Sequence, residues 1–162
     1  MMFVIQVKTG CEASAAATLT RLGFNIKAPQ KVMRIRKGGV WKHEVKPVFP
    51  GYIFLEADTY IEAAGYYKVK KTSGVVNFLG KGEPQRIQTS EAEYINWLWN
   101  SGVPLNASKV FVTPEGKKMI MSGPLRNYSG EYIEFDLRQK RARIRIPICG
   151  VMRNVTLPIE CI

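Results

Sequence analysis

The sequence changes character near residue 103. Before that point, short β-branched and aromatic runs alternate with stretches of helical spacing, whereas helical signals stop after Gly102 and Pro104. The remainder consists of short strand-like runs separated by glycines, at 109–112, 118–121, 131–135, 142–147 and 154–157. Because about fifty residues in five strands can bury a core only by curling, we expect a small β-barrel. The chain is therefore predicted to hold a first module at 1–103, a linker at 104–108 and a barrel at 109–162.

The first module is predicted to be an antiparallel sheet flanked by helices, which makes the whole chain α+β. Strands are expected at 3–7, 24–28, 52–55 and 75–79, and helices at 13–22, at 60–68 and from residue 90 onward. Thr9-x-x-Glu12 and Ser90-x-x-Glu93 match capping boxes at two helix starts. Pro50-Gly51 predicts a sharp turn that leads directly into the strand at 52–55.

The charge of the chain favours a polyanionic partner. There are 24 lysines and arginines against 13 acidic residues, a formal net charge of +11. Such a surplus favours nucleic acid, although it fixes neither the partner nor the fold. No apolar run is long enough to cross a bilayer and no signal peptide is visible at 1–9, so we expect a cytoplasmic protein without membrane contact.

No pattern in the sequence is typical of an enzyme or of a metal or cofactor site. His43 is the only histidine, and Cys11, Cys149 and Cys161 lie far apart without Cys-x-x-Cys spacing. Phosphate-binding glycine loops and paired catalytic carboxylates are also missing from the sequence. We therefore expect no catalysis, no cofactor, no metal and three free thiols. The acidic residues near the helices are expected to be helix-end or solvent charges: Asp58, Glu62, Glu91 and Glu93.

A strongly basic hairpin is predicted at 31–46, with Gly38 and Gly39 at its tip. Such a ribbon can be a solvated edge that resists pairing with other sheets, or it can contact nucleic acid. The sequence leaves both interpretations open. Its basic residues are Lys31, Arg34, Arg36, Lys37, Lys42 and Lys46.

A row of arginines marks the predicted barrel. Strand alternation places Ala142, Ile144 and Ile146 inside, so that Arg141, Arg143 and Arg145 point outward. Guanidinium groups bind phosphates through paired hydrogen bonds and stack on exposed bases, which favours contact with RNA. The alternative is a solvated strand whose charge is balanced across the ladder by Glu131, Glu134 and Asp136.

Four motifs in order resemble the NusG family of transcription factors. They are Phe3-Val4-Ile5-Gln6-Val7-Lys8-Thr9-Gly10-Cys11-Glu12, the Lys37-Gly38-Gly39 tip, Phe49-Pro50-Gly51-Tyr52-Ile53-Phe54, and Thr72-Ser73-Gly74-Val75-Val76-Asn77-Phe78-Leu79-Gly80. The segment from Ser122-Gly123-Pro124-Leu125 through Gly130 to Gly150 resembles the family's C-terminal KOW barrel. The resemblance covers nearly the whole chain. It implies an NGN-like first domain followed by an SH3-like KOW domain.

The resemblance also implies how the chain works. In the family, the N-terminal domain grips the clamp helices of RNA polymerase through an aromatic cavity and suppresses pausing, while the KOW domain recruits another partner. Phe49 and Tyr52 match cavity positions, and Phe3 lies where tryptophan is common. On residue grounds alone an aromatic before a Pro-Gly turn is a core residue, yet aromatic anchors also dominate interface energies. RNA polymerase is thus the expected partner of a monomeric chain that makes and breaks no bond.

Two departures from the family pattern bear on the barrel. Housekeeping members present an aromatic and an arginine near the last strand to meet a ribosomal protein, whereas this chain has Ile148-Cys149-Gly150-Val151, which argues against a ribosomal contact. The arginine row resembles the specialised LoaP antiterminator branch, thought to recognise an RNA hairpin. The residues expected to bind nascent RNA are Arg126, Arg138, Lys140, Arg141, Arg143, Arg145 and Arg153.

These features predict a transcription elongation and antitermination factor that binds RNA polymerase and contacts a nascent RNA hairpin. Two alternatives stay open. One is a housekeeping NusG-type factor that couples polymerase to the ribosome or to a termination factor. The other is a ribosome-associated RNA-binding protein.

Overall fold

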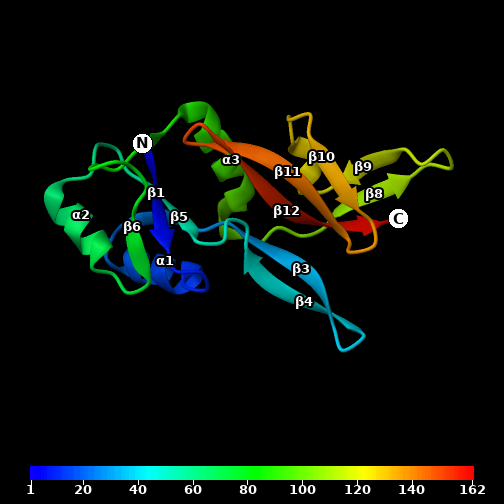
Figure 1. Cartoon of the computed structure of the whole chain (residues 1–162), viewed down its shortest axis with the longest axis horizontal. Coiled ribbons are helices and arrows are strands. Elements are labelled where there is room, and N and C mark those ends of the chain that lie inside the picture. The colour runs from blue at the N-terminus through cyan, green and yellow to red at the C-terminus, as the bar shows by residue number, and fades with distance from the viewer.

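The first module is built on a five-stranded antiparallel sheet. The computed structural model describes all 162 residues and orders the strands β2-β5-β1-β6, with β7 also paired to β1. The strands are β1 (Met2–Val7), β2 (Asn25–Lys27), β5 (Tyr52–Glu56), β6 (Val75–Phe78) and β7 (Arg86–Ile87). Helices α1 (Glu12–Arg21) and α2 (Ala63–Lys70) pack on one face. Helix α3 (Thr89–Trp99) covers the other and lies between the two modules (Figure 1).

The turn at Pro50-Gly51 has the predicted form. The amide of Tyr52 donates to the carbonyl of Phe49 at 3.1 Å, and Gly51 has a φ of 85°. Proline followed by a positive-φ glycine is the signature of a type II turn. Strand β5 begins at the next residue, as expected.

The basic hairpin forms a separate two-stranded sheet that projects from the body of the molecule (Figure 1). Its strands are β3 (Gln30–Lys37) and β4 (Val40–Pro47), and we call this pair the ribbon. Gly38 and Gly39 have φ values of 58° and 78°, which a two-residue turn of this hand requires. The predicted hairpin is confirmed.

The second module is a five-stranded sheet that curls into a half-barrel. Its order is β10-β11-β12-β8-β9, and β12 pairs with β8 in parallel. The strands are β8 (Ser108–Val112), β9 (Lys118–Ser122), β10 (Ile133–Asp136), β11 (Arg141–Ile148) and β12 (Val151–Cys161). Short 3-10 turns, Asn100–Gly102 and Pro124–Asn127, precede and interrupt the module. Ala142, Ile144 and Ile146 are at most 1% exposed, so the predicted alternation and the α+β fold are confirmed.

Three expectations about helix boundaries were wrong. Helix α1 starts at Glu12 after Cys11 with no side-chain cap, because the Glu12 carboxylate instead accepts from the amide of Gly10 at 2.6 Å. Helix α3 starts at Thr89, and the cap pairs Gln88 with Glu91 rather than Ser90 with Glu93. Helix α2 begins three residues later than expected and ends at Lys70. None of the helices is long and apolar enough to span a membrane.

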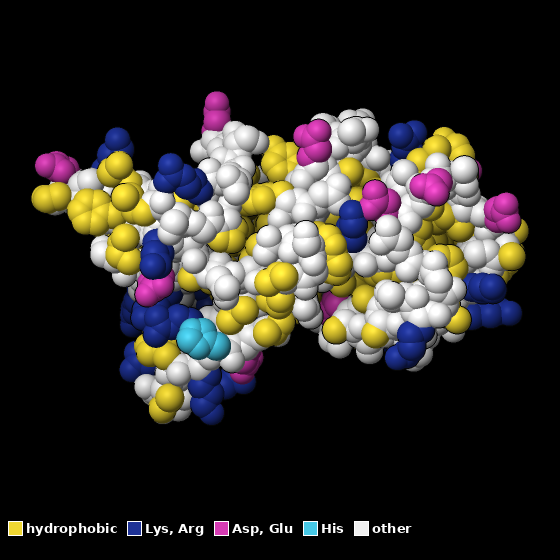
Figure 2. All heavy atoms as spheres, turned by 180° about the vertical axis from the view of Figure 1, so that it is seen from behind, with side chains coloured by type: hydrophobic (Ala, Val, Ile, Leu, Met, Phe, Trp, Pro, Cys, Tyr) yellow, Lys and Arg dark blue, Asp and Glu magenta, His cyan; other side chains and the backbone are white.

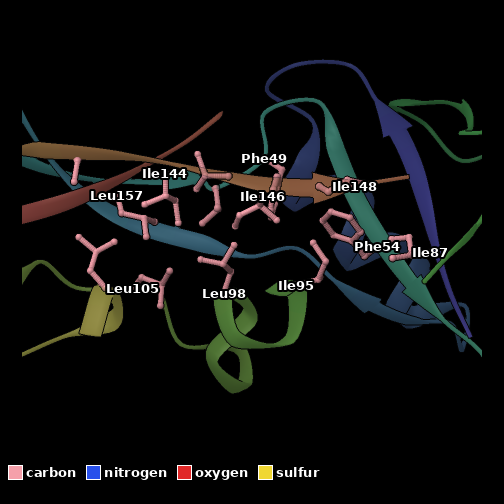
Figure 3. Close-up of a cluster of buried hydrophobic side chains, with 14 of the residues drawn as sticks. Phe49, Phe54, Ile87, Ile95, Leu98, Leu105, Ile144, Ile146, Ile148 and Leu157 are labelled. Atoms are coloured by element: carbon pink, nitrogen blue, oxygen red, sulfur yellow. The ribbon is translucent and has the colours of Figure 1, made fainter. Parts of the chain in front are cut away.

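The two modules share one apolar core. A cluster of 18 buried residues includes Val4 and Phe54 of the first sheet, Ile95 and Leu98 of α3, and Ile146 of β11. Figure 3 shows the α3 side chains pointing at the β11 side chains on one side and at Phe54 on the other. Helix α3 therefore fills the space between both sheets.

A buried carboxylate fixes the tip of the β11–β12 hairpin to α3. Glu91 is 5% exposed and accepts hydrogen bonds from the amides of Cys149 (3.2 Å) and Gly150 (3.0 Å). The expectation that Glu91 is a helix-end or solvent charge is thus only half right, since it caps α3 and also binds the second module. Trp97 of α3 stacks on Tyr128 of the second module, with ring centroids 6.1 Å apart. These contacts orient the barrel on the helix.

The ribbon and the segment 104–108 are also tied to the barrel. The amide of Val32 donates to the carbonyl of Leu105 at 2.8 Å, and Leu105 is buried. The ammonium of Lys31, on the same strand, donates to the carbonyl of Thr156 at 2.5 Å. Burial, and then the neighbouring Arg141 and Lys46, lower the pKa of Lys31 to about 8. The docked arrangement therefore disfavours the protonated form of Lys31.

The buried face of β11 should control stability. Ile144→Ala leaves a cavity at a fully buried position and is expected to reduce the free energy of unfolding by about 2 to 5 kcal/mol. Val151→Ala on the paired strand, at a side chain that is 55% exposed, should change it by less than about 0.5 kcal/mol. Urea denaturation of both variants checks this. Equal losses would contradict the assignment of the barrel interior.

Lys31 should make stability depend on alkaline pH. Because its pKa falls from 10.5 to about 8 on folding, the cost of burying the charge is complete below pH 8 and fades as pH rises toward 10.5. Lys31→Met removes that cost at every pH. The variant's advantage over wild type in unfolding free energy should therefore be about 2 kcal/mol smaller at pH 10 than at pH 7. Urea titrations at both pH values test this, and a difference independent of pH would contradict it.

Candidate functional site

Two of the three aromatic residues expected to bind polymerase lie together beneath the barrel. Phe49 is 4% exposed and meets Phe54 edge to face, with ring centroids 5.2 Å apart. Figure 3 shows Phe49 beside Ile146 of β11. Tyr52 is half-buried, and the guanidinium carbon of Arg153 lies 4.7 Å above its ring. In this arrangement the second module covers both residues.

Phe3 lies elsewhere. It is 1% exposed and packs in a second cluster with Ile5, Leu19 and Val69, on the face of the sheet that α1 and α2 cover. Alternation along β1 explains this, because Met2 and Val4 face α3 while Phe3 faces away. The structure thus brings Phe49 and Tyr52 together and separates Phe3 from them.

The arginine row differs from residue to residue in exposure. Arg143 and Arg145 are exposed, whereas Arg141 is half-buried and its Nε has no hydrogen-bond partner. The β10–β11 register places Asp136 opposite Arg141 and Glu134 opposite Arg143. Carboxylates therefore lie opposite two of the three arginines, as expected for a charge-balanced solvated strand. The exposure of Arg143 and Arg145 is also compatible with RNA contact.

Ion pairing along the row is weak. The Arg143 guanidinium is 3.9 Å from the Glu134 carboxylate, and both side chains are at least half exposed. The Glu134 carboxylate also accepts from the hydroxyl of Tyr132 at 2.8 Å, a hydrogen bond that raises the pKa of Tyr132. The Arg145 guanidinium stacks on the ring of Tyr132, 3.9 Å from its centroid. The row and Tyr132 thus form a mixed surface of guanidinium groups and an aromatic ring.

The remaining residues of the expected RNA set lie apart from one another. Arg126 and Arg138 are exposed, and Arg126 donates to the carbonyl of Met121 at 2.8 Å. Lys140 and Arg153 instead reach across to the first module. The Lys140 ammonium lies 4.8 Å from the ring centroid of Trp41 on the ribbon, and Arg153 covers Tyr52.

The ribbon is less uniformly charged than its sequence indicates. The Lys37 ammonium donates to the Glu44 carboxylate at 2.7 Å, and this hydrogen bond lowers the pKa of Glu44. Arg34 forms no ion pair but lies near the ring of Trp41, 5.6 Å from its centroid. Trp41 therefore lies between cations of both modules, a role that its place in an alternating strand did not reveal.

No group of three or more His, Cys, Asp and Glu side chains could hold a metal ion. All three cysteines are free. Burial and the nearby Glu91 carboxylate raise the pKa of the Cys149 thiol, so it is a weak nucleophile at neutral pH.

Comparison with known proteins identifies relatives of this arrangement. The family model described as "Transcription termination factor nusG" matches residues 2–96. The "Transcription termination/antitermination protein NusG" of Xylella fastidiosa (strain Temecula1 / ATCC 700964) is 26% identical over 91% of this chain and 90% of its own length. The protein of the same name from Bacillus subtilis (strain 168) is 24% identical over 91% of this chain and 89% of its own.

A solved structure shares the fold. The chain described as "Domain interaction in Thermotoga maritima NusG" superposes with a TM-score of 0.58 and 21% sequence identity, over 98% of this chain and 93% of that one. These comparisons do not single out the LoaP branch. Because the family model covers more than half of the sequence, the chain belongs to the NusG family of transcription termination factors.

Proposed function

We propose that the chain is a transcription elongation and antitermination factor that binds RNA polymerase through the face containing Phe49 and Tyr52. The names of its relatives support a role in termination and antitermination. In the proposal, the first module grips the clamp helices of the polymerase and suppresses pausing. Phe3 contributes indirectly from the opposite face of the sheet, where it packs against α1 and α2.

One observation carries the proposal: the aromatic face is apolar and is buried beneath helix α3 and the barrel together. Phe49 and Phe54 belong to the cluster that spans both modules. Parting of the modules would leave a contiguous apolar surface, and such surfaces mark interaction sites. Buried aromatic anchors of this kind dominate interface energies. The barrel must therefore leave this face before polymerase can bind there.

The proposal assigns the barrel to nascent RNA. Arg143 and Arg145 are exposed on neighbouring outward positions of β11, and Arg138 lies just before this strand. Guanidinium forks suit phosphates, and the stacked pair of Arg145 and Tyr132 offers a flat surface to an exposed base. Parting of the modules would also free Lys140 and Arg153 from the aromatic rings of the first module. An RNA hairpin with unpaired loop bases fits this surface.

A housekeeping factor is the second candidate, because the relatives carry the general family name. In that case the barrel would meet a protein and would bind RNA weakly. The turn at Cys149-Gly150, where housekeeping members meet a ribosomal protein, is held against Glu91 in the docked arrangement. A ribosomal contact is therefore not part of the proposal.

Polymerase binding should increase when the modules part. Glu91→Lys places an ammonium against the amides of Cys149 and Gly150 and should release the barrel. Immobilised Glu91→Lys protein is expected to retain several-fold more purified RNA polymerase than wild type. Adding Phe49→Ala or Tyr52→Ala to it should abolish the gain.

The matched control is Glu93→Lys, which makes the same charge change at an exposed position of the same helix. It should leave polymerase retention at the wild-type level. Undiminished retention by the double variant with Phe49→Ala would overturn the assignment of the aromatic face.

Hairpin binding should depend on the arginine row. Replacing Arg141, Arg143 and Arg145 together by glutamine is expected to weaken binding of a leader hairpin from the chain's own gene by at least roughly tenfold. The slope of log K against log salt should fall by about 2 to 3. Fluorescence anisotropy of the full chain measures both. The same replacement at the exposed Lys68 and Lys70 of α2 and at Lys71, which follows the helix, is the control. Equal losses would contradict a role for the row.

A further inference from the structure

Strand β9 is a free edge of the second sheet. It stands at the end of the order β10-β11-β12-β8-β9 and pairs with β8 on one side only. In Figure 1 the β8–β9 hairpin forms the end of the molecule that points away from the first sheet. The edge is therefore exposed whether the two modules are docked or parted.

The backbone of β9 has hydrogen-bonding groups that point away from β8. The carbonyl of Val110 accepts from an amide just after β12 at 3.0 Å, so the polar groups of the next residue, Phe111, face β9. Phe111 is paired with Met119. Alternation then turns outward the amides and carbonyls of the neighbouring residues, Lys118 and Ile120. The backbone hydrogen bonds outside the ladders include none to these outward groups, which are thus free to pair with an added strand.

An apolar surface accompanies the free edge. Phe111, Met119 and Met121 lie on one face of the hairpin and are 41%, 43% and 44% exposed. Figure 2 shows hydrophobic side chains gathered at this end of the molecule, at the upper left of the view. Methionine side chains adapt to apolar groups of varied shape and are common on surfaces that bind peptides. The face beside the edge therefore suits apolar side chains of a partner.

The charge along the edge is positive. Residues 117–126 contain Lys117, Lys118 and Arg126 but no carboxylate. None of these three cations forms an ion pair. The Arg126 guanidinium donates to the carbonyl of Met121 at 2.8 Å and so occupies one end of the edge, which leaves residues 118–120 for pairing. A partner with carboxylates would complement this charge.

These features distinguish between possible occupants of the edge. A second copy of this chain would bring two strands with the same cations side by side, and lysine on an edge strand opposes such self-pairing. A nucleic acid would be attracted by the cations but has no peptide backbone to pair with Lys118 and Ile120. An extended acidic segment of another protein matches both the charge and the backbone groups.

We propose that β9 is a docking site for an extended segment of a partner protein in which acidic residues alternate with apolar ones. The segment adds a strand to the sheet at residues 118–120. Because Lys118 and Met119 point to opposite faces of β9, alternation presents carboxylates to the lysine and apolar side chains to the methionines. The inference goes beyond the proposed function, since the site includes neither the aromatic face nor the arginine row.

NMR spectroscopy of the full, isotope-labelled chain tests the inference with two synthetic peptides of eight residues. One alternates glutamate with valine, and the other alternates lysine with valine. The acidic peptide should shift the amide signals of residues 118–120 and slow the solvent exchange of the Lys118 and Ile120 amides at least roughly tenfold. The basic peptide should leave these signals unchanged.

A charge reversal identifies the residues that select the peptide. Joint replacement of Lys117 and Lys118 by glutamate should weaken binding of the acidic peptide at least roughly tenfold and create binding of the basic peptide. The matched control is joint replacement of Lys68 and Lys70 by glutamate on α2, which makes the same charge change and should leave both affinities unaltered. Unshifted signals outside β9 show that each variant is folded.

Two further comparisons test the apolar contact and the strand pairing. Met119→Ala should weaken binding of the acidic peptide several-fold, whereas Val151→Ala, at another exposed apolar side chain, should not. Methylation of every amide nitrogen of the acidic peptide keeps its charges and side chains but prevents strand pairing, and should abolish its binding.

Equal affinity of the acidic peptide for wild type and for the variant with glutamate at 117 and 118 would overturn the inference. Tighter binding of oligouridylate than of the acidic peptide at the β9 amides would also overturn it, in favour of a nucleic acid. A dimer in sedimentation that is lost in the same glutamate variant would overturn it in favour of a second copy. None of these measurements involves polymerase or an RNA hairpin, so failure of the proposed function leaves this inference standing.

Discussion

Everything in this molecule depends on helix α3 having apolar side chains that serve two sheets at once. Ile95 and Leu98 are fully buried, and the cluster around them draws on β1 and β5 of the first module and on β11 and β12 of the second. Without helix α3, each of the two sheets would leave an apolar face exposed to water. In the docked arrangement, helix α3 and the barrel together cover the aromatic face around Phe49.

Charge opposes the docked arrangement that apolar contact favours. Lys31 is buried near Lys46 and Arg141, and Lys140 and Arg34 approach the same tryptophan from different modules. With a net charge of +11, the chain brings like charges together when it closes. Screening by salt weakens such repulsion, so ionic strength favours the closed form. A polyanion bound along the seam would neutralise the same charges at particular positions.

Much of the fold could be predicted from local patterns, because the patterns have local causes. The pair Gly38-Gly39 predicted the ribbon tip, and Pro50-Gly51 predicted the turn before β5. Strand alternation predicted the inner residues of β11. The docking of the modules has no such signal, since an apolar stripe does not say which surface will cover it. Glu91 illustrates the difficulty: as a helix-start residue it indicates a cap, and only the tertiary structure supplies the amides of Cys149 and Gly150. Phe3 and Phe49 likewise carry similar sequence signals but occupy opposite faces of one sheet.

The topology of the barrel has a consequence for the order of events on the ribosome. Strand β12 pairs with both β11 and β8, and it is the last of the five barrel strands to be synthesised. The barrel cannot close until β12 has emerged, whereas the first sheet is complete as soon as β7 has been made. For that interval the barrel does not yet cover the aromatic face of the new first module. Until β12 has paired, a chaperone that binds apolar surface has no competition from the barrel at this face.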